Sequence, residues 1–252
     1  MKPSIFALLI FATACRRDHV RWEGTQAALG DTLGQIALRE ASVEFVKPEV
    51  QVAPVDSMAC PASVASTTDG STLYAAWLRR RPDSSVAVVA SRSDDGGKQW
   101  TRPAMVDSVD VGLVGCARPG PSIAAAEGYV HVAYSLKAPE GFGVFFAHSM
   151  DRGATFQSPV IVVYGDRLSA TATAAHGMRV AVAYEDPSGS GRRVDVALSR
   201  TQGHTFEPRE RASPDEMPAT RPRIAIRDTV VALSFAGIDS MARAVRIGRL
   251  SK

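Results

Sequence analysis

Short apolar segments follow one another in a regular order along the chain and predict an all-β protein. Each segment is rich in small or β-branched residues and is bounded by Gly, Pro, Ser or Asp, which is typical of strands. The segments fall into four units of three. The expected first strands are 62–66, 122–126, 170–174 and 223–227. The second strands are 73–78, 130–136, 179–185 and 230–235, and the third strands are 86–92, 144–148, 194–198 and 243–250.

An eight-residue motif follows the third strand of the first three units. Its copies read SDDGGKQW at 93–100, SMDRGATF at 149–156 and SRTQGHTF at 199–206. The shared pattern is Ser-x-Asp-x-Gly-x-Thr-aromatic, with Gln99 in place of Thr in the first copy and Thr201 in place of Asp in the third. A motif that recurs at this spacing indicates a stack of similar supersecondary units.

Each residue type in the motif has a local structural role. An Asp side chain can accept hydrogen bonds from backbone N–H groups across a tight turn. Glycine can take a backbone angle that a side chain forbids, and the aromatic ring can pack between strands. The residues in these roles are Ser93, Asp95, Gly97, Trp100, Ser149, Asp151, Gly153, Phe156, Ser199, Gly203 and Phe206.

The three motifs resemble the Asp boxes, or BNR repeats, of sialidase-type β-propellers. The resemblance covers residues 43–252 and implies four-stranded antiparallel blades, of which this chain has room for four. In that family the box joins the third and fourth strands of a blade, on the face away from the usual active site. The resemblance therefore implies that Asp95 and Asp151 form turns and are not catalytic acids.

The fourth blade would lack an outer strand of its own. In the first three units that strand is expected to follow the box aromatic, at 100–103, 156–159 and 206–208. The same aromatic-x-x-Pro spacing occurs near the N-terminus at Phe45-Val46-Lys47-Pro48. We expect the segment 43–52 to pair with the strand at 243–250, which would close the propeller and cover an exposed edge.

The first residues have the features of a targeting segment. Lys2 precedes a short apolar run from Ile5 to Ala12, and the small residues before Cys15 suit cleavage, so residues 1–14 are expected to be a signal peptide. The segment resembles a bacterial lipoprotein signal, which implies lipidation at Cys15; an ordinary secretory signal is the alternative. Both place the protein outside the cytoplasm, either membrane-anchored at the envelope (periplasm or outer membrane) or secreted.

The segment between this signal and the propeller, residues 15–42, is expected to carry the lipid and act as a tether. Residues 26–41 have helical spacing, although two glycines weaken it. Cys60 and Cys116 each precede the first strand of consecutive blades, so we expect a disulfide between them. There is no CxxC or HExxH motif and the five histidines are dispersed, so we expect no metal and no cofactor.

The formal net charge of +3 over 252 residues is too small and too scattered to suggest nucleic acid as a partner. The densest basic run, Arg79-Arg80-Arg81, is interpreted as a solvated loop beside Pro82. True sialidases use three arginines to hold the substrate carboxylate and carry an Arg-Ile-Pro motif, which this chain lacks. They also have six blades.

The candidates for chemistry stand near the starts of first strands. Arg118, Arg167 and Arg221 could form an anion-binding cluster; alternatively they pair with the loop acids Asp110, Asp166, Asp215 and Glu216. Tyr74, Tyr134 and Tyr184 recur at equivalent positions of second strands and are expected in the core.

Tyr164 is the one tyrosine expected in a loop near acidic residues. Glu185 or Asp186 could supply one carboxylate of a glycosidase pair, but no convincing second carboxylate is found. We therefore favour a binding or scaffolding module that presents its loops to a glycan, a peptide or an envelope protein. The alternative is a glycoside hydrolase of the exo-alpha-sialidase type. A third possibility is a partial propeller that completes itself by dimerising.

Overall fold

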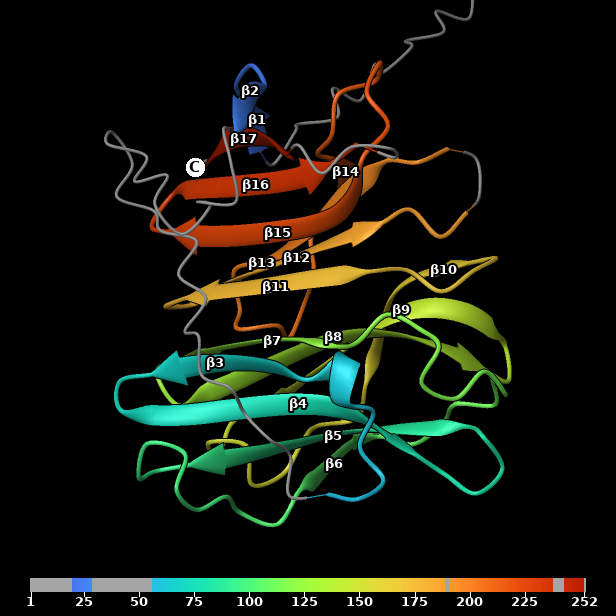
Figure 1. Cartoon of the computed structure of the whole chain (residues 1–252). Helices are drawn as coiled ribbons and strands as arrows, with labels where there is room; N and C mark the ends of the chain where they lie inside the picture. Colours follow the sequence, from blue (N-terminus) through green and yellow to red (C-terminus); the bar gives the residue numbers. More distant parts are fainter. Residues whose placement is uncertain (1–19, 29–55, 189–190, 238–242, 252) are drawn as a thin grey trace, which may run out of the picture.

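The computed structural model describes residues 20–28, 56–188, 191–237 and 243–251, which form four antiparallel sheets (Figure 1). The first sheet holds β3 (Ala65–Asp69), β4 (Thr72–Arg80), β5 (Val86–Ser93) and β6 (Ala104–Asp107). The second holds β7 (Ser122–Ala126), β8 (Tyr129–Ala138), β9 (Gly141–Ser149) and β10 (Val160–Gly165). The third holds β11 (Thr171–His176), β12 (Arg179–Glu185), β13 (Val194–Ser199) and β14 (Glu210–Arg211).

The fourth sheet combines both ends of the chain. It contains β15 (Thr220–Arg227), β16 (Val230–Ala236) and β17 (Arg243–Leu250), and its outer strands are β1 (Val20–Trp22) and β2 (Gln26–Ala28). The all-β prediction and the four units are therefore confirmed. Among the described residues, no helix has the length and apolar character needed to span a membrane.

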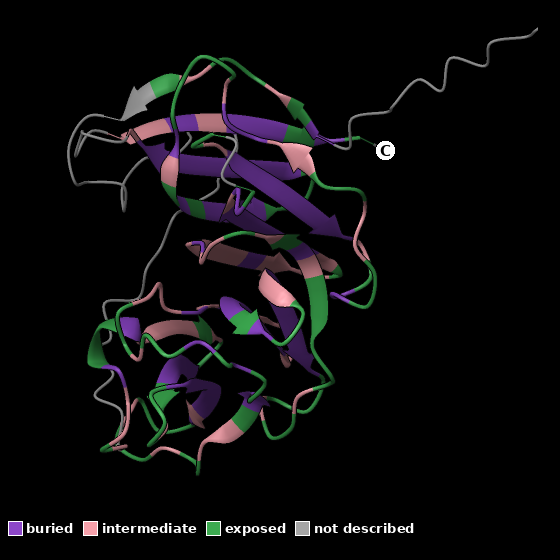
Figure 2. Ribbon diagram, turned by 90° about the vertical axis from the view of Figure 1, so that its right-hand side faces the viewer, coloured by how far each residue is buried: buried purple, intermediate pink, exposed green. Residues whose placement is uncertain are grey.

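The sheets pack against one another through apolar side chains. Figure 2 shows that the residues of the central strands are mostly buried. Tyr74 and Tyr134 belong to the cluster between the first and second sheets, and Tyr184 belongs to the cluster between the second and third. All three rings are buried, as the periodicity predicts. Each buried aromatic ring contributes about 1.5–3 kcal/mol of hydrophobic stabilisation, so these tyrosines stabilise the stack and are unavailable as nucleophiles.

The inner strands β3, β7, β11 and β15 pack against one another in chain order, and the sheets lie in a row from the first to the fourth (Figure 1). Among the described residues, β3 and β15 do not pack together as consecutive inner strands do. The described residues therefore do not show the ring closed.

An N-terminal strand does complete the fourth sheet, but it is not the expected one. Strand β1 pairs with β17 from Val20 opposite Leu250, and β2 pairs with the other half of β17, with Gln26 opposite Val245. The outer edge of β17 is thus taken by residues 20–28, and the pairing expected for 43–52 is wrong. The segment 43–52 itself lies outside the described residues.

The packing at Gly248 explains why β1 lies here. Gly248 has Val20 and Trp22 directly over it, and the Trp22 ring also faces the Arg246 guanidinium, 5.6 Å from the ring centroid. A larger residue at 248 would prevent this approach. The helix expected at 26–41 is wrong for Gln26–Ala28, which form a strand, and its remaining residues lie outside the described part of the chain.

The starts of the first inner strand and of the outer strands differ from the prediction for reasons visible in the backbone. Pro61–Ser63 form a 3-10 turn, so the first inner strand begins at Ala65 and not at residue 62. The outer strands expected at 100–103, 156–159 and 206–208 are wrong in position: β6, β10 and β14 begin at residues 104, 160 and 210, after the prolines at 103, 159 and 208, because proline cannot donate to the ladder.

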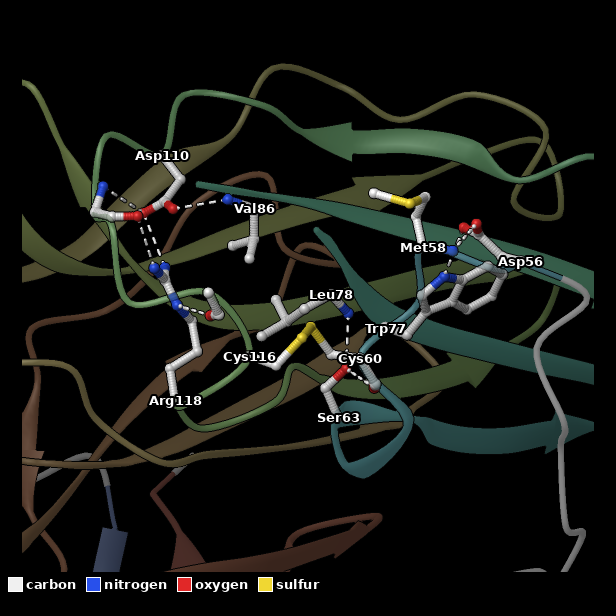
Figure 3. The surroundings of a disulfide bond; sticks show 12 residues. Asp56, Met58, Cys60, Ser63, Trp77, Leu78, Val86, Asp110, Cys116 and Arg118 are labelled. Atoms are coloured by element: carbon white, nitrogen blue, oxygen red, sulfur yellow. Dashed lines mark hydrogen bonds and ion pairs between the residues drawn. A yellow bond between two sulfur atoms is a disulfide. The ribbon is translucent and has the colours of Figure 1, made fainter. Parts of the chain in front are cut away.

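The expected pair Cys60 and Cys116 is bonded, with Cα atoms 5.4 Å apart (Figure 3). Beside the bridge, the Ser63 hydroxyl donates to the Cys60 carbonyl over 2.7 Å and accepts from the Leu78 N–H. The loop that enters β7 is thus fixed to the start of the first sheet.

Candidate functional site

The loops at the two ends of the strands differ between the two sides of the row of four sheets. The inner strands all start at the right-hand end in Figure 1, and the loops from third to fourth strands lie at the opposite end. The right-hand end carries irregular loops, and among the described residues it holds a cleft of about 230 Å³ between the third and fourth sheets. The cleft is lined by Arg167, Leu168, Glu185, Arg192, Ala219 and Thr220.

The wall of the cleft formed by the fourth sheet is an irregular strand. Strand β15 changes register between Thr220 and Arg223, and Arg221 has φ 50°, a left-handed conformation that is uncommon for a residue with a side chain. Its N–H donates to Glu185 Oε1 over 2.7 Å. The bulge therefore joins the fourth sheet to the end of β12 and fixes one oxygen of the Glu185 carboxylate.

The surroundings of the bulge are positively charged. Arg243 is partly buried; it donates to the Arg221 carbonyl over 2.7 Å and to the Ser234 hydroxyl over 2.8 Å. Burial first, and then the nearby charges of Arg223 and Arg221, lower the pKa of Arg243 to about 10. Arg221, Arg223 and Arg243 are thus close enough to repel one another. Binding of an anion here would be favourable, because its negative charge would relieve this repulsion.

The other wall of the cleft has one arginine anchored to backbone. Arg167 donates to the carbonyl oxygens of Asp186, over 2.9 Å, and Gly191, over 3.4 Å. Arg192, which precedes β13, is exposed. Arg167, Arg221 and Glu185 were candidates from the sequence, and all three lie at this cleft in the structure. Arg192 and Arg243 were missed, because their role depends on the packing of two sheets.

Arg118 does not belong to this cluster. Its side chain is fully buried and forms an ion pair with Asp110, with 2.9 Å between Nη1 and Oδ1 (Figure 3). It also donates to the carbonyls of Gly115 and Gly112. The proposed three-arginine cluster is therefore wrong for Arg118, and the alternative, pairing with a loop acid, applies to it.

Tyr164 and Asp186 are also outside the cleft lining. Tyr164 lies on the outer strand β10, not in a loop; it is half exposed, and its ring is edge-on to Phe145. Asp186 is buried, where it pairs with Arg193 over 3.1 Å and accepts from the Ser188 hydroxyl. Glu185 is thus the one acidic residue among those that line the cleft.

The three motif turns share one hydrogen-bond pattern at the left-hand end. In each, the hydroxyl of the first serine accepts from the glycine N–H, over 2.8, 2.8 and 2.9 Å in chain order. Asp95 accepts from the Gln99 N–H, and Asp151 accepts from the Thr155 N–H and hydroxyl. These contacts hold the carboxylates in turns.

The pKa values of both carboxylates follow from these bonds. Hydrogen bonds from Gln99 and Ser93 lower the pKa of Asp95. Burial raises the pKa of Asp151, but the bonds from Thr155 and Ser149 outweigh it and leave the pKa lowered. In the third turn the Thr201 hydroxyl takes the place of the carboxylate and accepts from the Thr205 N–H over 3.0 Å.

A histidine cluster lies between the second and third sheets, which the scattered positions in the sequence did not suggest. His131 of β8, His148 of β9 and His204 of the third motif turn have rings 6.4 Å (131 to 148) and 4.6 Å (148 to 204) apart. Neither ring nitrogen of His131 has a hydrogen-bond partner, and burial, with His148 and His204 nearby, lowers its pKa to about 3. Within the described ranges no three His, Cys, Asp or Glu side chains form a metal-binding group.

Comparison with known proteins shows the fold. No family model matches the chain and no curated protein matches it. Among solved structures, the Hadza microbial sialidase Hz136 superposes with a TM-score of 0.54 at 17% identity, covering 75% of this chain and 46% of that one. The phage phi92 endosialidase superposes with a TM-score of 0.50 at 9% identity, covering 75% and 36%.

At these identities the likeness shows a sialidase-like β-propeller fold of four-stranded antiparallel sheets. The chain spans less than half the length of either neighbour. Function is determined by the residues of a site and does not follow from the fold.

Proposed function

We propose that this protein is a non-catalytic binding module of the cell envelope that takes an acidic saccharide in the cleft between the third and fourth sheets. The observation that carries the proposal is the composition of the cleft, in which Arg167 and Arg192 stand beside a single carboxylate. Next to the cleft, the Arg243 side chain donates to the backbone carbonyl of Arg221. Arginine binds carboxylates and sulfates through paired, charge-assisted hydrogen bonds.

Glu185 supports binding of the saccharide's hydroxyl groups. One of its oxygens accepts from the Arg221 N–H, and a carboxylate has further lone pairs that can accept from sugar hydroxyls. A saccharide with a carboxylate and several hydroxyls therefore matches a cleft with two guanidinium groups and one acceptor.

The same composition favours binding over hydrolysis. Glycosidases that use two carboxylates place one on each side of the scissile bond, about 5–9.5 Å apart. Glu185 is the one carboxylate of the cleft lining, and the neighbouring Asp186 is buried against Arg193. Hydrolysis of an α-sialoside is the second candidate function, and the sialidase-like fold is the observation that favours it.

The location at the envelope rests on the N-terminal sequence. Residues 1–14 and Cys15 are proposed to export the protein and attach it to a membrane by a lipid. Replacing Cys15 with serine should move the protein from the membrane fraction to the soluble fraction. Fractionation that is unchanged by this replacement would contradict the anchor.

Calorimetric titration tests the binding proposal. Sialyllactose and an oligogalacturonate serve as acidic probes, and lactose is the neutral control. We expect an acidic probe to bind, and Arg167→Ala or Arg192→Ala to weaken binding by about tenfold, which corresponds to the loss of one charge-assisted hydrogen bond. Arg102→Ala, an exposed arginine near the first motif turn, is the matched control and should bind normally.

Two results would contradict the proposal. One is equal binding of lactose and the acidic probes; the other is an unchanged affinity in Arg167→Ala and Arg192→Ala. Release of a fluorophore from a fluorogenic sialoside, abolished by Glu185→Gln, would establish the hydrolase instead.

A further inference from the structure

The loop between β6 and β7 presents an apolar surface to solvent. Val109, Val111, Leu113 and Val114 are 46%, 46%, 70% and 52% exposed, and they stand within six consecutive residues. Single exposed apolar residues are normal on a protein surface, whereas a contiguous group marks a contact with another molecule or a membrane. We call residues 109–114 the apolar loop.

The apolar loop is held from within by a buried ion pair (Figure 3). Asp110 points inward, where it pairs with Arg118 and accepts from the N–H groups of Val86 and Lys137 over 2.9 and 3.2 Å. Both charged side chains of the pair have no exposed surface. Removing one partner of a buried pair leaves an uncompensated charge and is strongly destabilising, so the conformation of the loop is tied to this pair.

Further bonds fix the loop at both ends. The Val111 N–H donates to the Lys137 carbonyl over 2.8 Å, and the Gly115 N–H donates to the Ser84 carbonyl over 2.9 Å. Cys116, two residues beyond Val114, is tied to Cys60 by the disulfide. The loop is thus ordered before it meets any partner, so contact costs little conformational entropy.

Basic side chains flank the apolar loop. Arg81 donates to the Ser108 carbonyl at the start of the apolar loop over 2.7 Å. Lys137, exposed on β8, lies next to Gly112. The acids of this region are Asp83 and Glu140, both exposed in the neighbouring turns, and the buried Asp107 and Asp110. Arg79 is paired with Asp56.

We propose that the apolar loop inserts into the interface of a membrane that contains anionic lipid. Aliphatic side chains enter the boundary between headgroups and acyl chains, while flanking cations reach the lipid phosphates. The apolar residues protrude, as the exposure of Leu113 shows, and so suit a soft surface better than a groove.

This inference is independent of the proposed function, because no residue of the apolar loop lines the cleft. It is also independent of lipidation. If Cys15 carries a lipid, the lipid and the inserted loop would both contribute to membrane affinity.

Vesicle co-sedimentation tests the inference, with the exported protein carrying Cys15→Ser so that no lipid contributes. Vesicles of equal parts phosphatidylcholine and phosphatidylglycerol should bind this protein. The double variant Leu113→Glu/Val114→Glu should reduce the bound fraction about tenfold. Met178→Glu is the matched control. Met178 is 53% exposed in the turn between β11 and β12, away from the apolar loop, so this substitution should leave binding unchanged.

A second measurement reports the insertion itself. Leu113→Cys, labelled with a polarity-sensitive fluorophore, should show a blue-shifted emission on the anionic vesicles, and Met178→Cys should not.

Several results would overturn the inference. They are no binding to vesicles, equal loss in the Met178→Glu control, and an unshifted label at Leu113 on vesicles that bind. A dimer in light scattering that Leu113→Glu/Val114→Glu converts to a monomer, without vesicle binding, would show instead that the loop is an interface between two copies.

Discussion

Replacing His131 with phenylalanine should remove much of the acid sensitivity of the folded protein. His131 lies fully buried on β8, stacked between Tyr129 and Phe146, with His148 and His204 as the titratable groups on the elements packed against it. No hydrogen-bond partner is present for either ring nitrogen. A proton on this ring would place a charge in an apolar site, so the folded protein keeps it neutral.

The magnitude follows from the two pKa values. The pKa of His131 is lowered from 6.5 to about 3 by burial first and the two neighbouring histidines second. Below pH 6.5 the unfolded chain binds a proton that the folded protein does not, so stability falls as the pH falls from 6.5 towards 3. Between pH 7 and pH 5 the loss from this one group is about 2 kcal/mol.

Urea unfolding at pH 7 and pH 5 measures the effect. The parent protein should lose about 2 kcal/mol more than His131→Phe over this interval. His176→Gln, a replacement of an exposed histidine near Asp228, is the control and should lose as much as the parent. Equal losses in the parent and in His131→Phe would show that His131 is not the group that resists protonation.

Three further predictions concern the fold. Val20→Asp places a charge at the buried start of β1 and should destabilise the protein by several kcal/mol, or drive aggregation through the bared edge of β17, as thermal unfolding and light scattering would show. Gly203→Ala should lower the stability by about 1–3 kcal/mol, because a Cβ there would lie 2.5 Å from the Phe146 ring. Gly203 also has φ +87°, which side chains disfavour. Gly191→Ala is the control, because a Cβ at Gly191 would meet open space. Cys60→Ala/Cys116→Ala should lower the stability in urea by up to about 4 kcal/mol, and a parent protein with two free thiols after denaturation without reductant would contradict the bridge.

The strand order could be predicted because its signals are local. Each motif turn closes its own hydrogen bonds within seven residues, so the sequence around Ser93, Ser149 and Ser199 is enough to place the turns. Strand β1 could not be found in this way. It has three residues, and it adopts its place only because Gly248, more than 200 residues later, leaves room for Val20 and Trp22.

The candidate site was predicted in part for a related reason. Arg118 and Arg167 stand in similar positions of the sequence, yet one is buried against Asp110 and the other lines the cleft. The difference depends on which carboxylate the fold brings near, which composition and spacing do not reveal. The same holds for His131, His148 and His204, which come together only when the third motif turn packs on the second sheet.

The pairing of β1 and β2 with β17 has a consequence for biogenesis. A chain that emerges in order, from a ribosome or through a translocation pore, can complete its first three sheets from neighbouring segments. The fourth sheet must wait, because residues 20–28 emerge early and residues 243–250 emerge late. Such long-range pairing is slow to form, and until it forms the early strands have an unpaired edge that invites aggregation. Residues 20–28 would therefore most need the protection of a chaperone until residues 243–250 have emerged.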